Sequence, residues 1–415
     1  MRMLEAQAAD AFVVKLENRG SRFDEIEPAV RKIVDDVRRN GDAALLKYAH
    51  QFDGLDQQQP VRVCESQMKE AWTQAPAQLQ DALRKAAKNI RRFCEWQKPN
   101  AWTKSRGGAS LGQIVRPLDS VGCYVPGGRF PLVSTLLMTV IPAQVAGVKS
   151  IRVVSPRPSS EVLAAAAMLG VEQFYRIGGA QGIAALAYGT ETIARVSKIV
   201  GPGNLYVTAA KKLVAFDCAI DILAGPTEVV IVSSKGNPAF IAADLVAQAE
   251  HDPETLAVFI TTSRKLGTAV GKQLNGTRSG DQNKVAEQSL ANHGAVLIAD
   301  SRQQAFEWAN RIAPEHITTD RKDLPLVSNA GSVFIGDYSA QAAGDYASGP
   351  NHVLPTAGGA RFRGGLSVMD FVKVISVQEL SSVALRKLSS TVVRLAETEG
   401  LRAHAQSIRV RCPSA

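Results

Sequence analysis

Residues that could bind a metal ion gather in the stretch 247–253, which reads Ala-Gln-Ala-Glu-His-Asp-Pro. Gln248 and His251 are three positions apart and Asp244 lies one turn earlier, so all three share one face of a helix. By residue type alone, Glu250 or Asp244 is a better zinc ligand than the neutral carboxamide of Gln248. The stretch therefore predicts half of a metal site. The alternative is that His251 only flanks a helix C-terminus, where a cation suits the helix dipole.

A carboxylate and an imidazole stand side by side at Glu315 and His316, directly after Pro314. Either group can act as a general acid or base when its surroundings bring its pKa near the working pH. The pair therefore indicates proton transfer. The same dipeptide would also suit a surface loop, because adjacent side chains often point apart.

The segment 344–352 is a loop bounded by glycines that also holds a carboxylate and an imidazole. Asp345 could supply an oxygen ligand to zinc, and His352 a further ligand or a hydrogen bond to a substrate. A turn held by Asp and Asn caps is the alternative. His404 lies far from His251 in the sequence, so a shared site needs a tertiary or an intersubunit contact. Otherwise it is a tail histidine.

Two glycine turns, at 178–182 and 201–204, are suited to phosphate or dinucleotide binding through backbone N–H groups and helix N-termini. Neither turn matches G-x-G-x-x-G. The P-loop, H-E-x-x-H and G-x-S-x-G patterns are absent, so the commonest ATPase, metalloprotease and hydrolase templates are excluded. The turns are compatible with nucleotide binding and do not by themselves establish it.

The elements that must position these residues alternate between strand, glycine turn and helix. We expect a first set of strands at 121–125, 150–155, 173–177 and 197–200, and a second at 229–232, 256–261, 295–298 and 332–335. A helix should begin at Asn237-Pro238 and stop by Pro253. Residues 23–96 and 377–404 read as helices, with Asn40-Gly41-Asp42 ending one helix and capping the next. Such alternation predicts an α/β fold with parallel sheets.

The composition fits a soluble globular protein of more than one core. The 415 residues are 45% hydrophobic and only 6% aromatic, which suits buried parallel strands. The net charge of +9 is scattered, and its densest run, at 84–92, lies on an amphipathic helical pattern. A nucleic-acid-binding protein would need a clustered basic face with aromatic platforms, and the sequence has neither.

Cysteine use and hydropathy indicate a cytoplasmic protein. The five cysteines are an odd number with no C-x-x-C, so reduced thiols are expected. The N-terminus lacks the apolar core of a signal peptide. The most apolar stretch, 133–148, is short and broken by Pro142 and Gln144, which argues against a membrane span.

Taken together, these motifs resemble the histidinol dehydrogenase family. The matching runs come in the family's order, cover nearly the whole chain and read YVPGG at 124–128, GGAQ at 178–181, GPGN at 201–204, AGPTE at 224–228, QAEH at 248–251, PEH at 314–316, GDYASGPNHVLPT at 344–356 and LRAH at 401–404. Each run is weak alone, whereas the ordered set is very specific.

The resemblance implies a zinc-dependent enzyme that oxidises L-histidinol to L-histidine through an aldehyde-level intermediate, using two NAD and one zinc per subunit. It implies that Gln248, His251, Asp345 and His404 bind the metal, with His404 donated by the other subunit of a homodimer. Gln248 thus replaces Glu250 as the expected ligand.

The resemblance also implies the role of each remaining site residue. Glu315 and His316 would be catalytic: His316 would take the alcohol proton, and Glu315 would activate water. The substrate contacts would be Thr227, Gln248, His251, His316, Asp345, His352, Glu399 and His404, with Glu399 also crossing the dimer interface. The NAD contacts would be Tyr124, Gln181 and Asn204. Thr227 stands where the family commonly has serine and keeps its hydroxyl.

The fold implied by the resemblance has two Rossmann-like parallel-sheet domains of the incomplete Rossmann type, with small helical N- and C-terminal appendages. The expected borders are 1–20 for the N-terminal appendage, 21–122 plus 228–366 for the catalytic and zinc domain, 123–227 for the NAD-binding domain, and 367–415 for a C-terminal appendage that contributes to the partner's active site.

Two other functions compete with this interpretation. Relatives on the same scaffold oxidise other alcohols, such as the anionic sulfopropanediol, which would need a cation where Glu399 stands. Glu399 and His352 therefore favour histidinol. A zinc hydrolase would use the metal without NAD, and absorbance of NADH separates that possibility.

Overall fold

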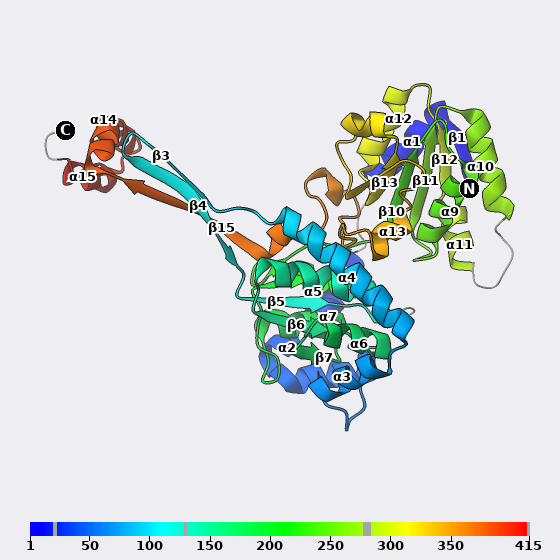
Figure 1. The fold of residues 1–415 in the computed structure, drawn as a ribbon, viewed down its shortest axis with the longest axis horizontal. Helices are drawn as coiled ribbons and strands as arrows, with labels where there is room; N and C mark the ends of the chain where they lie inside the picture. The colour runs from blue at the N-terminus through cyan, green and yellow to red at the C-terminus, as the bar shows by residue number, and fades with distance from the viewer. Residues whose placement is uncertain (20–22, 128–130, 277–283, 413–415) are drawn as a thin grey trace. The chain divides into compact units, whose positions relative to one another are not determined.

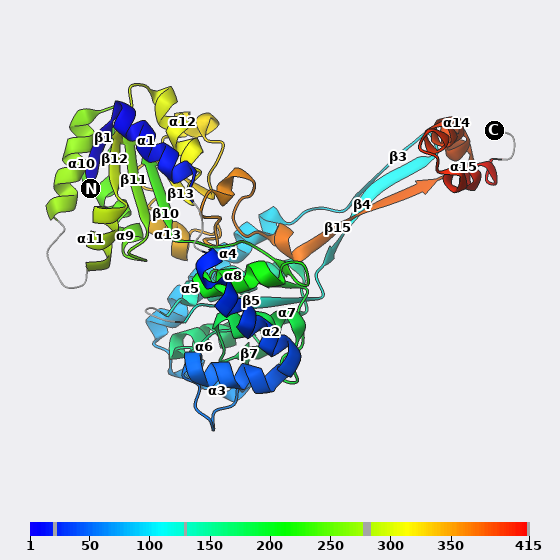
Figure 2. The ribbon, with the colours of Figure 1, turned by 180° about the vertical axis from the view of Figure 1, so that it is seen from behind.

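The computed structural model describes residues 1–19, 23–127, 131–276 and 284–412. The chain divides into two compact units, which Figures 1 and 2 show from opposite sides. The first unit comprises Met1–Gln97 and Leu118–Phe371, and the second comprises Lys98–Pro117 and Val372–Ala415.

The first unit contains a six-stranded, all-parallel sheet, here called sheet A. Its order is β1-β12-β11-β10-β13-β14, with bounds Arg2–Glu5, Ala295–Ile298, Leu256–Thr261, Glu228–Val232, His316–Thr319 and Ser332–Ile335. The segments of β10 and β11 are almost wholly apolar and buried, as strands covered on both faces must be.

Two layers of helices cover sheet A. Helices α1 (Ala6–Glu17) and α12 (Arg302–Ile312) pack on one face, where Val13 and Trp308 meet Val230. Helices α9 (Pro238–Ala249), α10 (Arg264–Gly276) and α11 (Lys284–Asn292) pack on the other, where Leu245 meets Val229. The predicted start of α9 is confirmed, because Asn237 Oδ1 accepts a hydrogen bond from Ala239 N at 2.9 Å and Pro238 is the first helical residue.

The first unit also contains a second six-stranded sheet, sheet B, in the order β2-β7-β6-β5-β8-β9. The bounds are Arg62–Val63, Gln173–Tyr175, Ser150–Val154, Ser120–Tyr124, Lys198–Val200 and Ala219–Ile220. Only β2 is antiparallel to its neighbour. The crossover helices of sheet B are α5 (Val133–Ala146), α6 (Ser160–Met168), α7 (Gly179–Tyr188) and α8 (Leu205–Val214). In each sheet five consecutive parallel strands take the order 3-2-1-4-5, so the prediction of two Rossmann-like sheets is confirmed.

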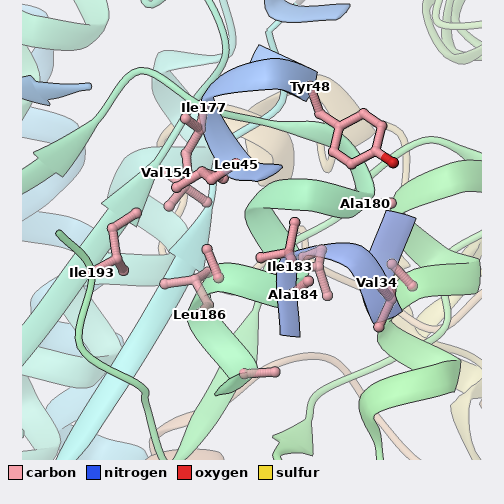
Figure 3. Close-up of a cluster of buried hydrophobic side chains, with 14 of the residues drawn as sticks. Val34, Leu45, Tyr48, Val154, Ile177, Ala180, Ile183, Ala184, Leu186 and Ile193 are labelled. Atoms are coloured by element: carbon pink, nitrogen blue, oxygen red, sulfur yellow. The ribbon is translucent and has the colours of Figure 1, made fainter. Parts of the chain in front are cut away.

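The N-terminal helices belong to sheet B. Helices α2 (Phe23–Tyr48, kinked at Gly41), α3 (Glu65–Gln74) and α4 (Ala77–Gln97) follow one another, and Val34, Leu45 and Tyr48 of α2 share one buried cluster with Ile183 of α7 (Figure 3). The expected borders had joined residues 21–122 to the catalytic sheet and made residues 1–20 an appendage. The structure instead places 2–17 in sheet A and its covering layer. An apolar helix stripe shows that a helix is covered, but it does not show which sheet covers it.

The second unit is an antiparallel sheet with two helices. Its strands are β15 (Val372–Leu380), β4 (Ala109–Pro117) and β3 (Trp102–Arg106), in that order, followed in the chain by α14 (Ser382–Thr398) and α15 (Arg402–Arg409). The expectation of a wholly helical appendage is therefore wrong for residues 372–380. Nearly every residue of β15 is exposed, and the apolar–polar alternation that identifies a half-buried strand is interrupted where Val374 and Ile375 follow one another.

Short elements complete the first unit: η1 (Ala49–Asp53), η3 (Arg321–Leu326), α13 (Gln341–Tyr346), η4 (Gly359–Arg361) and η5 (Val368–Phe371). Across the described ranges, no helix combines the length and the apolar character needed to cross a membrane.

Candidate active site

The amino-terminal edge of sheet A collects the residues predicted to transfer protons. His316 is the first residue of β13 and Glu315 comes just before it. Strand β10 lies alongside, with Val229 opposite His316, and the backbone N–H of Glu228 donates to Glu315 Oε2 at 3.1 Å. Thr227 precedes β10 directly. Parallel strands therefore bring Thr227, Glu315 and His316 to one edge although 87 residues separate Glu228 from Glu315.

Two helices place two of the predicted metal ligands, Gln248 and Asp345, at the same edge. A crossover helix runs antiparallel to the strands, so the C-terminal end of α9 lies at the amino edge of the sheet. Gln248 occupies the last turn of α9, and its Nε2 donates to Asp345 Oδ2 of α13 at 2.9 Å. Asp345 Oδ1 lies 3.4 Å from His316 Nε2. His251, two residues beyond the end of α9, is exposed.

The imidazole of His316 is buried, and both of its nitrogens lie near carboxylates. The residue is 3% exposed, its ring lies 5.8 Å from that of Phe334 between centroids, and its Nδ1 lies 3.7 Å from Glu315 Oε2. Neither ring nitrogen makes a hydrogen bond with any residue in the described part of the chain. A buried polar atom without a partner costs about 1–3 kcal/mol, which is tolerated where a ligand supplies the partner.

Burial and mutual charge shift the acid–base properties of this pair. Burial raises the pKa of Glu315 to about 8, although the neighbouring imidazole opposes the rise. Burial lowers the pKa of His316, but the carboxylates of Glu315 and Asp345 outweigh it and bring the pKa above its ordinary value. Glu315 and His316 therefore titrate as a coupled pair near the range where an enzyme exchanges protons.

His352 connects this edge to sheet B. Its Nδ1 donates to the Asp345 carbonyl oxygen at 2.7 Å, which leaves Nε2 to accept from the Thr135 hydroxyl at 3.3 Å. Burial lowers the pKa of His352, so the neutral imidazole is favoured. Thr135 lies in the first turn of α5, which follows the carboxyl end of β5. Thr135 was not identified from the sequence, because α5 also carries Ser134 and Thr139 and nothing in the pattern distinguishes one hydroxyl from the others.

Two of the predicted NAD contacts flank the point where the strand order of sheet B reverses. Tyr124 ends β5, and Asn204 follows the neighbouring strand β8 and caps α8, its Oδ1 accepting from Val207 N at 3.1 Å. Ligands of open α/β sheets bind at such a reversal, outside the carboxyl ends of the strands. Asn204 is exposed, whereas Tyr124 is buried and its hydroxyl accepts from Gly179 N at 3.1 Å. Gly128, the last residue of the YVPGG run, lies outside the described residues.

The third predicted NAD contact is engaged inside the protein. Gln181 is 1% exposed, and its Nε2 donates to Asp53 Oδ2 at 2.9 Å. The same oxygen accepts from Gly178 N at 2.9 Å, so an internal carboxylate occupies the N-terminus of α7. Asp53 belongs to no motif recognised in the sequence.

The remaining predicted site residues lie in the second unit. Glu399 caps the C-terminus of α14 and His404 lies in the first turn of α15; both are exposed. Within the first unit, the structure thus joins Gln248, Asp345, Glu315 and His316.

The alternative metal ligands suggested by residue type do not join this group. Glu250 is exposed, and Asp244 lines a pocket with Ser233 and Asp320, which follow the carboxyl ends of β10 and β13 at the opposite edge of sheet A. Burial raises the pKa of Asp244 to about 6.

The donor set of the first unit suits zinc but is incomplete. It offers a carboxamide oxygen from Gln248, a carboxylate from Asp345 and an imidazole from His251, which are donor types that zinc accepts. In the described ranges, no group of three or more His, Cys, Asp or Glu side chains is arranged to hold a metal ion. A four-coordinate site therefore needs a further ligand.

Comparison with known proteins agrees with the motif order. The model of the histidinol dehydrogenase family matches residues 16–412. The chain belongs to the histidinol dehydrogenase family. It is 45% identical over 401 residues to histidinol dehydrogenase of Methanothermobacter thermautotrophicus, covering 94% of each protein. It is 43% identical over 400 residues to that of Geobacter sulfurreducens, covering 93% of each.

Solved structures give the same result. The crystal structure of histidinol dehydrogenase from Elizabethkingia anophelis has a TM-score of 0.94 at 33% identity, covering 100% of this chain and 98% of that one. An acetylating aldehyde dehydrogenase from Geobacillus thermoglucosidasius, at 11% identity and a TM-score of 0.50, shares the fold alone. The chain is therefore an enzyme of the histidinol dehydrogenase family, an oxidoreductase of histidine biosynthesis, as the motifs predict.

Proposed function

We propose that the chain is a zinc- and NAD-dependent histidinol dehydrogenase that oxidises L-histidinol to L-histidine in two successive hydride transfers. The observation that carries this proposal is the buried Glu315–His316 pair with its free imidazole nitrogens, placed beside Asp345 and Gln248 in a chain of this family. NAD, when bound, would accept one hydride in each oxidation.

His316 acts as the base of the first oxidation. Its free ring nitrogen accepts the alcohol proton as the adjacent carbon loses hydride, which yields the aldehyde. Burial keeps bulk water from competing for that nitrogen. Glu315, held by Glu228 N at 3.1 Å, and Asp345 then stabilise the imidazolium that forms.

Glu315 acts as the base of the second oxidation. The aldehyde carries one hydrogen on the reacting carbon and must gain water before it can lose another hydride. A carboxylate with a pKa of about 8 is basic enough to take a proton from that water. The hydrate then loses its hydride, and the product is a carboxylate.

Gln248, His251 and Asp345 would hold zinc, with His404 of a second subunit as the fourth ligand. When bound, zinc would fix the imidazole and amine nitrogens of histidinol and so orient the reacting carbon. The hydrogen bond from Gln248 Nε2 to Asp345 supports this assignment, because it leaves the carboxamide oxygen available as a ligand.

The remaining contacts with substrate and NAD are proposed from where the residues lie in the fold. Thr227, at the start of β10, and the neutral imidazole of His352 would contact the substrate, and Glu399 of the second subunit would suit its cationic amine. Tyr124 and Asn204 would contact NAD at the strand reversal of sheet B, with Gln181 behind them.

A homodimer is supported by the surface of the second unit. Its exposed large apolar side chains include Val374, Ile375, Val377, Val383, Leu388, Leu395 and Val410. Exposed apolar surface of this kind marks an interaction site, and a second copy of the chain would cover it. This arrangement would also carry His404 and Glu399 to another subunit.

The location proposed for the enzyme is the cytoplasm. All five cysteines are free, which fits a reducing compartment.

The direct test follows NADH absorbance with purified enzyme and NAD. L-Histidinol should give NADH, and a chelator should abolish the signal until zinc is restored. Sulfopropanediol serves as the comparison substrate. Turnover of the sulfonated diol without turnover of histidinol would disprove the substrate, and full activity in metal-free enzyme would disprove the zinc role.

A further inference from the structure

A buried ion pair lies beneath the 201–204 turn of sheet B. Lys211 of α8 contacts Asp221, which follows β9, and their side chains are only 1% and 0% exposed. Neither residue belongs to the motifs discussed above, and neither takes part in the proton transfers.

This pair holds both backbone polar groups of Gly201. Lys211 Nζ donates to the Gly201 carbonyl oxygen at 3.0 Å, and the Gly201 N–H donates to Asp221 Oδ2 at 2.7 Å. The other carboxylate oxygen of Asp221 accepts from Lys211. The ion pair and the glycine therefore form one network in which both carboxylate oxygens of Asp221 are used, and Arg363 donates to the Asp221 carbonyl oxygen from outside it.

The turn held in this way packs directly against Tyr124. Gly201 has a φ of +115°, and a Cβ at this position would overlap the Tyr124 carbonyl oxygen. Three residues later, Asn204 caps α8. The ion pair thus fixes, from inside the domain, the segment that lies between the two residues flanking the strand reversal.

Stability alone gives little reason for such a pair. Removing two charges from water is costly, and well-packed apolar residues of similar volume often serve a fold equally well. A fully satisfied buried network does, however, restrict the backbone it holds to one geometry. A loop that must meet a ligand in one conformation benefits from that restriction.

We propose that Lys211 and Asp221 are positioning residues that hold the 201–204 turn in the conformation that binds NAD. The inference rests on the proposed role of Tyr124 and Asn204 as NAD contacts. It states that the pair controls the affinity for NAD and leaves the affinity for histidinol unchanged.

A second ion pair of the same domain, at the strand that precedes the 201–204 turn, provides a matched control. Lys198 begins β8, and its Nζ lies 3.0 Å from both Asp370 Oδ1 and the Asp370 carbonyl oxygen. This pair is also largely buried and lies at the amino end of β8, and its contacts are with Asp370 rather than with Gly201. Arg363 connects the two pairs, because its guanidinium donates to the Asp221 carbonyl oxygen and lies 3.1 Å from Asp370 Oδ1.

The experiment compares Lys211→Met with Lys198→Met in the full-length enzyme. We measure KM for NAD and for histidinol, kcat, the Kd for NAD by calorimetry, and Tm. Lys211→Met should raise the Kd and the KM for NAD about tenfold, or about 1.4 kcal/mol, with KM for histidinol unchanged. Lys198→Met should lower Tm without changing either NAD constant. Lys211→Arg keeps the positive charge and the N–H donors, so this variant should retain most of the wild-type affinity for NAD.

Equal loss of Tm in both methionine variants with unchanged NAD constants would overturn the proposal. If Lys211→Met does not fold, Lys211→Met/Asp221→Asn decides, because it leaves no buried charge unpaired. Asn204→Ala separates this inference from the proposed function. If KM for NAD rises in Asn204→Ala but not in Lys211→Met, only the positioning role is refuted. If it rises in neither variant, both the positioning role and the proposed NAD site are refuted.

Discussion

At the scale of single residues, the site depends on two neighbours with different tasks. Glu315 receives a backbone hydrogen bond from Glu228, whereas the ring nitrogens of His316 face carboxylates and make no hydrogen bond with the described residues. Both side chains are buried at one strand end, and their charges shift each other's pKa. The two oxidations should therefore be separable by substitution.

Glu315→Gln should separate them. The amide cannot take a proton from water, so hydration of the aldehyde should fall by about 10²–10⁴-fold while the first oxidation continues. The measurement is NADH formed per histidinol together with trapping of the aldehyde. The variant should yield about one NADH and a trapped aldehyde. His316→Asn is the matched comparison and should lose the first oxidation. A Glu315→Gln enzyme that still makes histidine at the wild-type rate would contradict the assigned role.

The pH dependence follows from the same carboxyl group. Only its ionised form activates water, and its pKa is about 8 in the folded protein. The rate of oxidation of the supplied aldehyde should therefore rise with pH and level off above about pH 8. A pre-steady-state pH profile measures this. A rate that is already maximal at pH 6 would show that Glu315 is not the base.

Residue type was an incomplete guide to this site. The carboxylates Asp244 and Glu250 are chemically better ligands than Gln248, yet Asp244 lines a pocket at the other edge of sheet A and Glu250 is exposed. Which residue reaches Asp345 is decided by where α13 packs against α9, and spacing within one helix cannot reveal that.

At the scale of elements, the site forms where strand starts and helix ends meet. Strand β13 begins with His316, and α9 and α13 bring Gln248 and Asp345 to it. This is the amino edge of sheet A. In sheet B the proposed NAD contacts lie instead at the carboxyl edge, where ligands of doubly wound sheets usually bind.

A glycine in α13 offers a test at this scale. A Cβ at Gly344 would come 2.6 and 2.8 Å from two ring atoms of Phe334, whose ring packs on His316. Gly344→Ala should therefore displace Phe334 or Asp345 and lower kcat/KM at least about tenfold, equivalent to about 1.4 kcal/mol in the transition state.

Gly271 provides the matched control, because it lies inside α10 and no atom of the described residues comes within 4 Å of its Cβ position. Gly271→Ala should retain full activity and gain up to about 1 kcal/mol of stability from helix propensity. Equal activity of the two alanine variants would show that the packing of α13 does not control the site.

The sequence predicted strands correctly where both faces of the strand are buried. The apolar runs at 256–261, 295–298 and 332–335 are strands with the expected bounds. Strand β13 was missed, because His316-Ile-Thr-Thr carries three polar residues on a strand that lies between β10 and β14, where function overrides the pattern. The hairpin of β3 and β4 and the strand β15 were missed because β3 and β15 are largely exposed, β4 is mostly half-buried, and none of the three keeps a regular apolar–polar alternation.

At the scale of the whole molecule, the residues of the proposed site are divided between two compact units. Gln248, His251 and Asp345 belong to the first unit, and Glu399 and His404 to the second. From its position in the sequence, His404 can share a site with His251 only through a tertiary or an intersubunit contact. Only the family resemblance favours the intersubunit contact. The expected domain borders assign residues 21–97 to the catalytic domain, whereas the helices of this segment pack on sheet B. Amphipathic helices do not specify which of two similar sheets they cover.

Mixed dimers test the intersubunit site. His316→Ala and His404→Ala enzymes should each be inactive. Mixing their subunits should restore up to about a quarter of wild-type activity, because half of randomly assorted dimers are mixed and each has one complete site. Zinc content should be low in His404→Ala alone. Restoration requires that His404 acts on the other subunit, so no recovery in dimers shown to be mixed would contradict the shared site.

The central claim is that one active site performs two oxidations on the same substrate. The most direct measurement is the number of NADH molecules formed per L-histidinol consumed, with the organic product identified by mass spectrometry. We predict two NADH and L-histidine, with no free aldehyde accumulating in the wild-type enzyme. One NADH per histidinol with aldehyde as the final product would contradict the account.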